Sequence, residues 1–450
     1  MDDWDWELFP DGERFLGQQL AFFLNNHHFA KSLATKIERE TSTRFFDWID
    51  NIALPRQSTD EQALRKIGYR KTSDYLFENG LVFRNQRSRL FPVLLVEDNL
   101  TTLSLKTEEL EDFQKSCSST GTIQGKRNSC LRSAEIAREG TFVLKAVERK
   151  GTGNFTVDDM NDIDEYMKVL SMFETRKREY ESDQRGMAEL NHLAESTADL
   201  LQPSRLTDAF FRAERSYWEK RNTAGQVQKR RQDDFGLGWA NNDHHTFRSS
   251  RNAFASLIGV FELIGMKPRE KFYAGEQARW GAQIMEEPAT NIVAFADVDL
   301  GENETKIDFA RRGLPEKLEL GTVGLWVALH GESILQAGLH HLAASFRFDA
   351  LRDDLQKLGV QMMKPFSNFS FLKQAFTQGE LWKTDEQRVL TLVKQNRLTS
   401  EQRSRFLEMG ALGSHLENIQ RGSGFKGFNQ ASVSAIIQET DPRKLTSRYA

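Results

Sequence analysis

Two pairs of adjacent histidines give this sequence its clearest chemical signal. The pairs are His244 with His245, in "WANNDHHTFRSSR", and His340 with His341, in "AGLHHLAAS". Six of the nine histidines in the 450-residue chain fall within residues 244–415. Imidazole nitrogens are common ligands of divalent transition metals, so both segments are candidate ligand strands. The alternative is a set of unrelated polar residues at the starts of strands.

Strand alternation separates the two histidines of the first pair. In an extended segment His244 and Arg248 share one face, and His245 lies on the other. Arginine can hold a carboxylate through two parallel hydrogen bonds, so the face that carries Arg248 is the better candidate for a polar site. A surface ion pair is the alternative role for Arg248.

The elements that would position these residues form a pattern that appears twice after residue 238. The first copy reads "HHTFRSS", "NAFASLIGVFELIGM", "REKFYAGE", "ARWGAQIMEE" and "TNIVAFADVDL". The second reads "LHHLAASF", "FDALRDDLQKLGV", "QMMKPFS", a long helical insertion at 370–410, and "SHLENIQRG". Each copy opens with a strand, continues with a helix and returns to strands, which predicts an α+β fold.

A weaker copy of the same pattern precedes these two. It has "IDNIAL" in the position of the opening strand. We therefore expect three parts: an N-terminal half with a leading helix over 1–155, a helical connector and linker over 156–238, and a C-terminal domain over 239–450. Within the connector, residues 223–238 are the expected linker.

Composition excludes several classes of function. The formal net charge of −4 leaves no general attraction for nucleic acid or for an anionic membrane. No window approaches eighteen apolar residues, so no membrane span is expected. The acidic start "MDDWDWELFPDGERF" has no basic and apolar leader, and the two cysteines are expected to be reduced thiols. Together these features predict a cytoplasmic protein.

The order of elements resembles the vicinal-oxygen-chelate superfamily, whose paired βαβββ modules form half-open barrels around one metal. The segment "LENIQRGSGFKGFNQASVSAIIQE" is similar to the end of 4-hydroxyphenylpyruvate dioxygenase. The segment "VFELIGMKPREKFYAGE", with a His-x-x-x-Arg strand before it, resembles 2-oxoadipate dioxygenase/decarboxylase. The resemblance covers roughly residues 240–440, is faint over 45–150, and is absent over 156–222.

The resemblance implies a ligand set. The metal histidines fall on His244 and His341, and the carboxylate falls on Glu417. Both histidine positions are doubled here, so His245 and His340 remain alternative ligands. In the N-terminal half Asn51 takes the place of a metal histidine, and an amide is a poor ligand beside imidazole. That half would then keep the fold without binding metal.

The resemblance also implies an activity. Two imidazoles and one carboxylate leave open positions on Fe(II), as in non-haem iron oxygenases, although Mn(II), Co(II) and Zn(II) also fit this set. We expect a dioxygenase that acts on dioxygen and a 2-oxo acid or a related small carboxylate, through oxidative decarboxylation and hydroxylation. A non-oxidative isomerase or lyase and a non-catalytic small-molecule-binding protein are the alternatives. A homodimer is compatible with each of these functions.

Four further residues have candidate roles beside the metal. Arg248 would hold the substrate carboxylate, and His415 would lie next to Glu417 on the same strand face. Phe425 and Phe428, in the loop before the final helix, would close the pocket against water. Their alternatives are a solvent-facing histidine for His415 and simple core packing for the two phenylalanines.

Overall fold

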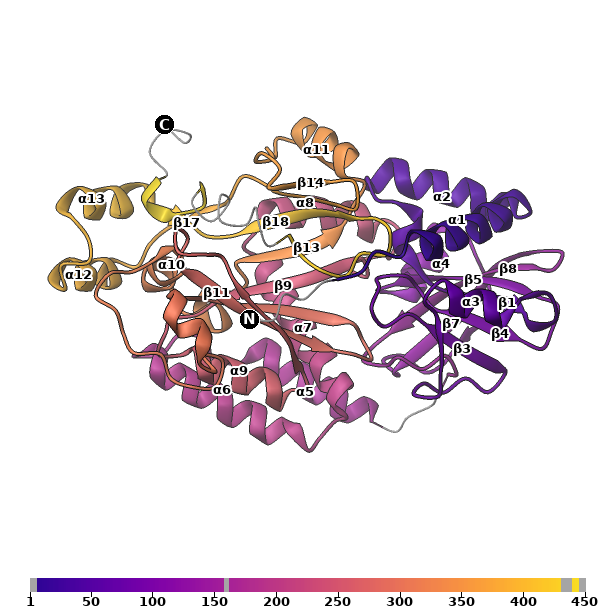
Figure 1. The fold of residues 1–450 in the computed structure, drawn as a ribbon, viewed down its shortest axis with the longest axis horizontal. Helices are drawn as coiled ribbons and strands as arrows, with labels where there is room; N and C mark the ends of the chain where they lie inside the picture. The colour runs from indigo at the N-terminus through magenta and orange to yellow at the C-terminus, as the bar shows by residue number, and fades with distance from the viewer. Residues whose placement is uncertain (1–5, 158–161, 430–438, 445–450) are drawn as a thin grey trace.

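Two mixed eight-stranded sheets form the centre of the molecule. The computed structural model describes residues 6–157, 162–429 and 439–444. The strand orders are β2-β3-β4-β1-β5-β8-β7-β6 and β10-β11-β12-β9-β13-β18-β15-β14. Figure 1 shows the N-terminal sheet beside the C-terminal sheet, with helices over both. Neither order closes on itself, so the predicted α+β fold of paired modules is found as two open sheets.

The N-terminal sheet contains two βαβββ units. The first comprises β1 (Ile49–Pro55), α3 (Glu61–Lys66), β2 (Arg70–Thr72), β3 (Gly80–Arg84) and β4 (Val93–Val96). The second comprises β5 (Thr101–Thr107), α4 (Leu110–Ser116), β6 (Ile123–Gln124), β7 (Leu131–Glu139) and β8 (Phe142–Arg149). Two helices precede them, α1 (Pro10–Asn25) and α2 (His28–Thr41). The expected single leading helix is therefore divided, and His27 caps the second part by accepting from the Ala30 N–H.

The C-terminal sheet repeats this order. Its first unit comprises β9 (Asn242–Arg248), α9 (Phe254–Leu263), β10 (Lys267–Tyr273), β11 (Trp280–Glu287) and β12 (Ile292–Asp299). Its second comprises β13 (His341–Ser345), α11 (Phe348–Lys357), β14 (Ser367–Phe369), β15 (Leu372–Phe376) and β18 (His415–Arg421). Helix α10 (Thr322–His330) lies between the units.

The insertion in the last unit is shorter than predicted. Residues 372–376, expected to be helical, form the third strand of the unit, and the insertion follows them. It comprises β16 (Leu381–Trp382), α12 (Glu386–Lys394), α13 (Ser400–Met409) and β17 (Ala411–Leu412). Its apolar side chains pack against α10 through Leu325 and Leu329. The run "QMMKPFS", predicted as a strand, forms only an isolated bridge at Met362 before β14 begins.

Helices α5 (Ile163–Thr175), α6 (Asp183–Ala198) and α7 (Pro203–Glu219) connect the halves. Proline suits the first turn of a helix because its missing N–H has no partner there, and α7 begins at Pro203. The buried Phe211 of α7 lies against His245, with ring centroids 4.6 Å apart, and against Phe247. The connector therefore covers the outer face of β9.

The predicted linker at 223–238 is largely a helix, α8 (Thr223–Asp233). Asn222 caps it by accepting from the Gly225 N–H at 2.7 Å. The Gln228 amide then donates to the carbonyl oxygen of Thr41 at 2.8 Å. The segment is thus a packed part of the scaffold, in which Gln228 and Gln232 are buried and form hydrogen bonds.

Within the described residues, the helices are too short or too polar to cross a bilayer.

Candidate metal centre

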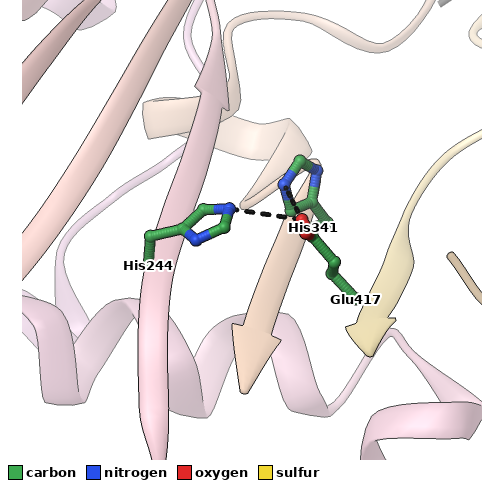
Figure 2. A group of neighbouring side chains, drawn as sticks. All are labelled: His244, His341 and Glu417. Atoms are coloured by element: carbon green, nitrogen blue, oxygen red, sulfur yellow. Dashed lines mark ion pairs between the residues drawn. The ribbon is translucent and has the colours of Figure 1, made fainter. Parts of the chain in front are cut away.

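His244, His341 and Glu417 converge on one point inside the C-terminal sheet. The Nε2 atoms of His244 and His341 lie 3.2 and 3.0 Å from Glu417 Oε2. Figure 2 shows the three side chains pointing toward one another from three strands. All three residues are buried, and their candidate ligand atoms lie within 4.8 Å of one another. Residues separated by more than 170 positions in the sequence therefore meet in one cluster.

The strand register explains this convergence. On β9, His244 is opposite Ala343 of β13, and Ala343 is opposite Glu417 of β18. His341 lies two residues before Ala343, opposite Thr246. Residues two apart on a strand project from the same face, so all three side chains leave the same face of the sheet.

Asp243 fixes the orientation of the His244 ring. Its Oδ1 lies 2.9 Å from His244 Nδ1, which places the proton on Nδ1 and leaves Nε2 free to act as a ligand. Asp243 also accepts two hydrogen bonds from Arg421, at 2.7 and 3.0 Å. Burial alone would raise the pKa of Asp243, but Arg421 and Arg89 hold that pKa well below its usual range.

Glu417 is prepared as an anion in the same way. Its Oε1 accepts from the Gln374 amide at 2.8 Å, while Oε2 faces the two histidines. Burial favours the neutral acid, but His244 and His341 lower the pKa of Glu417 strongly. Burial opposes protonation of His244, but Glu417 and Asp243 raise the pKa of its ring, and a bound metal ion would replace that imidazolium as the balancing cation.

His341 is held differently from His244. The Thr246 hydroxyl lies 2.8 Å from His341 Nε2, and His341 Nδ1 has no partner in the described part of the chain. Burial lowers the pKa of His341, which favours the neutral imidazole that a metal requires. Thr246 thus faces the atom that would bind the ion.

The alternative histidines point elsewhere. His245 Nδ1 lies 3.2 Å from the Val293 carbonyl, and its Nε2 lies 3.3 Å from Arg215. His340 Nδ1 lies 3.1 Å from the Gly413 carbonyl, and its ring packs against Trp326. Burial lowers the pKa of both rings, which are neutral packing groups outside the cluster.

His415 lies next to the cluster without joining it. It is opposite His341 in the register and donates from Nδ1 to the Thr377 carbonyl at 2.8 Å. Its Nε2 is buried without a partner among the described residues. Burial lowers the pKa of His415 to about 3, so the ring is neutral. The solvent-facing alternative is wrong for this residue, which is fully buried.

The two candidate pocket phenylalanines separate. Phe428 packs edge-on against His244, with ring centroids 5.4 Å apart, and against Phe295 at 4.4 Å. Phe425 instead packs against Phe371 in another apolar cluster. Only Phe428 therefore lies against a candidate ligand. The closing helix expected after this loop falls on residues 430–438, which lie outside the described residues.

Arg248 is buried beside the cluster with unused hydrogen-bonding capacity. It is 1% exposed, and its Nε and Nη1 have no partner in the part of the chain that the structure describes. Burial lowers the pKa of its guanidinium to about 10, so it is charged at neutral pH. It is therefore not the surface ion pair that was its alternative.

Asp297 was not predicted and faces the same region as Arg248. It is opposite Arg248 in the register, and its Oδ1 has no partner among the described residues. Burial raises the pKa of Asp297 to about 7. The signal in the sequence was an acid inside the apolar run "IVAFADVDL". Gln374 and Thr246 carried no comparable signal, because polar residues of these types are common on strands.

The donor set fits a divalent metal ion. Metal–nitrogen and metal–oxygen bonds are about 2.0–2.2 Å long, so two donors at right angles around one ion lie roughly 3 Å apart. The 3.2 and 3.0 Å separations from Glu417 Oε2 match that geometry. In a second group of donors, Glu109, Glu111 and Glu148, the last two are already paired with Arg132 and Lys150.

The N-terminal sheet has no such donor set at the equivalent place. Following the register across the sheet, Asn51, Thr102 and Lys145 occupy the positions of His244, His341 and Glu417. The supporting ion pair is nevertheless kept, since Asp50 binds Arg149 at 2.7 Å as Asp243 binds Arg421. The equivalence inferred from the sequence for Asn51 therefore agrees with the strand pairing.

The sequence matches no family model and no curated protein. Similar solved structures include a candidate hydrolase from Shewanella frigidimarina, at 16% identity over 50% of this chain and 98% of that chain, with a TM-score of 0.33. They also include a 4-hydroxymandelate synthase mutant from Streptomyces coelicolor, at 10% identity over 88% and 99%, with a TM-score of 0.26. A methylmalonyl-CoA epimerase from Mycobacterium tuberculosis aligns at 11% identity over 41% and 89%, with a TM-score of 0.23. These identities and TM-scores are too low to establish a family. The fold is therefore defined by the strand order, and the site by its geometry.

Proposed function

We propose that the protein is a metal-dependent dioxygenase that acts on a 2-oxo acid or a related small carboxylate, with Fe(II) held by His244, His341 and Glu417. The observation that carries this proposal is the convergence of two imidazoles and one carboxylate on one buried point. Three protein ligands leave coordination positions for small molecules, the arrangement of non-haem Fe(II) oxygenases.

When bound, Fe(II) supplies positions for the keto and carboxylate oxygens of the substrate and for dioxygen, together with the electrons for oxygen chemistry. The chain supplies orientation and exclusion of water. Asp243 holds His244 in one tautomer, and Gln374 holds one oxygen of Glu417 so that the other faces the site. Phe428 and Phe295 shield the His244 side of the site with apolar rings.

Arg248 supports a substrate with a second carboxylate. It lies four residues beyond His244 on the same strand face, so the two Cα atoms are about 13 Å apart. Its buried N–H groups, which have no partner among the described residues, would cost less free energy when a carboxylate accepts from them. A small diacid could place one end at the metal and the other at Arg248.

Oxygen uptake by anaerobically Fe(II)-loaded protein tests the proposal. A panel of 2-oxo acids with and without a second carboxylate should produce substrate-dependent uptake, with the diacids preferred. Turnover of a substrate without oxygen would instead support the isomerase or lyase alternative. Binding without turnover would support a small-molecule-binding protein.

Arg248→Lys tests the substrate contact separately from the metal. The variant should retain Fe(II) and raise KM for a diacid by about tenfold or more, because lysine cannot replace the two-pronged guanidinium contact. Arg251→Lys is the matched control, since Arg251 is also buried but is paired with Glu304. Equal kinetics for the Arg248 variant and the wild type would contradict the proposed contact.

A further inference from the structure

A cavity of about 520 Å³ lies between the N-terminal and C-terminal halves. Side chains from both sheets and from α7 line it. None of His244, His341 and Glu417 is among the lining residues, although the supporting residue Asp243 is. The cavity is therefore separate from the metal centre. Its volume falls within the range of small-molecule sites in proteins.

The walls of the cavity come from equivalent positions of the two sheets. Asp50 with Arg149 lines one side, and the equivalent pair Asp243 with Arg421 lines the other. Two further equivalent positions differ in charge. When the strand registers of the two sheets are matched, Lys106 of β5 is equivalent to Ser345 of β13. In the same way Arg84 of β3 is equivalent to Glu286 of β11. The cavity is thus more cationic on its N-terminal side.

Three cations in the cavity wall have no described carboxylate within ion-pair distance. Most lining charges are paired: Arg44 with Asp47, Arg149 with Asp50, Arg212 with Asp208, Arg421 and Arg89 with Asp243, and Lys426 with Glu286. Arg84, Lys106 and Arg215 form no ion pair within 4.0 Å among the described residues.

At least two of these three residues contact neutral aromatic groups where an anion would bind more strongly. Arg215 is 6% exposed, and its guanidinium contacts His245 at 3.3 Å. Arg84 lies over the Tyr75 ring at 4.4 Å. Burial lowers the pKa of Arg84, Lys106 and Arg215, which is the sign of cations removed from water without full compensation. Glu108 acts on Arg215, and Asp50 acts on Arg84 and Lys106, only from beyond ion-pair distance.

We propose that this cavity binds a small dianion, a molecule that carries either a phosphate group or two carboxylates. Guanidinium and ammonium groups from β3, β5 and α7 would each donate charge-assisted hydrogen bonds to it. The paired charges around them keep the rest of the wall neutral and favour a compact ligand over an extended polyanion. The proposal is independent of the reaction assigned to the metal centre.

Calorimetric titration of the full-length protein with inorganic phosphate and with malonate, at constant ionic strength, tests the site. At least one of the two should bind saturably at one equivalent, and acetate should not. The dianion that binds more tightly identifies the chemistry as phosphate or dicarboxylate. Absence of saturable binding by both would overturn the proposal.

Variants locate the binding. Lys106→Met and Arg84→Gln should each weaken it by at least about tenfold, because each removes a charged hydrogen-bond donor. Lys145→Met is the matched control: Lys145 lies on the neighbouring strand and does not line the cavity, so the affinity should change less than twofold. Using two cavity variants keeps the test valid if one of them fails to fold.

Arg248→Lys separates this cavity from the substrate contact proposed at the metal centre. In metal-free protein, where no metal holds the first carboxylate of a diacid, dianion affinity should be unchanged in that variant. If Arg248→Lys abolishes binding while Lys106→Met and Arg84→Gln retain it, the anion binds at the metal centre and the cavity proposal is wrong. Equal weakening by Lys145→Met and Lys106→Met would also contradict it, since that result indicates general electrostatic attraction.

Discussion

Asp243 connects the metal centre to the scaffold at the scale of single residues. It contacts His244 through one oxygen and is held in place by Arg421. A carboxylate behind a ligating histidine fixes the tautomer and raises the basicity of the ring. The contribution of Asp243 to metal affinity should therefore exceed its contribution to folding.

Asp243→Asn should lower metal affinity by about 10- to 100-fold. Asp50→Asn offers a matched control, because Asp50 forms the equivalent ion pair with Arg149 beside no donor set. Both variants lose a buried ion pair, and only the first should lose metal affinity. Calorimetric titration with Co(II) measures this, and equal affinities for the two variants would contradict the assigned role.

Glu332 predicts a pH dependence of stability. It is 1% exposed and accepts from the Ser250 N–H, and burial raises its pKa to about 7, with Asp183 adding to the effect. The folded protein then binds a proton that the unfolded chain releases near its ordinary pKa of 4.5. Stability should fall as pH rises from about 4.5 to about 7, by about 3 kcal/mol at most.

Glu332→Gln isolates this effect. The amide keeps an acceptor for Ser250 and cannot ionise, so the variant should gain unfolding free energy relative to the wild type as pH rises. Denaturant unfolding at pH 5 and pH 8 measures the difference. Parallel pH profiles for the two proteins would show that the Glu332 pKa is not raised.

His244 and His245 show how much strand alternation can predict at the residue scale. Alternation placed His244 and His245 on opposite faces but could not choose between them, because β9 is buried on both faces. Connector helix α7, whose packing is not visible in the sequence, covers the His245 face. Arg248 was the useful signal, since a charged residue on a buried strand marks the polar face.

At the scale of elements, the two sheets share more than their strand order. The register between β1 and β5 skips Asp50, and the register between β9 and β13 skips Asp243. Each bulge therefore turns an aspartate toward an arginine on the fourth strand of the next unit. Bulges re-aim side chains and increase local twist, and both sheets use one at the same place.

Restoring the donors in the N-terminal sheet tests this equivalence. The triple variant Asn51→His, Thr102→His and Lys145→Glu should raise Co(II) binding from one to two equivalents per chain, because the bulge and the Asp50–Arg149 pair are already present. Asn51→His alone should leave one equivalent. A folded triple variant that still binds one equivalent would show that the two sheets differ in geometry.

Element prediction was most accurate where periodicity was strong. Strands β10 to β12 were anticipated because their apolar runs are bounded by turn residues. The polar sequence of helix α8 predicts a linker, whereas its packing depends on contacts with Thr41 and Glu40, about 190 residues away. Strand β15 has only five residues and lies beside helices, so its periodicity is too short to distinguish it from the helical insertion.

At the scale of the whole molecule, one sheet carries the donor set and the other carries the same framework without it. The halves are joined by contacts such as that of Arg89 with Asp243 and that of Ser42 with Asp354. These contacts place the cavity between the sheets, where no pattern within a single segment could have predicted it. The equivalent positions on each side became apparent only from the strand register.

The central claim is that His244, His341 and Glu417 bind one divalent metal ion. Co(II) titration of metal-free wild-type protein and of Glu417→Gln, followed by calorimetry and by the visible spectrum of the bound ion, tests it most directly. The wild type should bind one equivalent, and the variant should bind at least about 100-fold more weakly because it lacks the anionic ligand. One equivalent bound with equal affinity by both proteins would contradict the assignment.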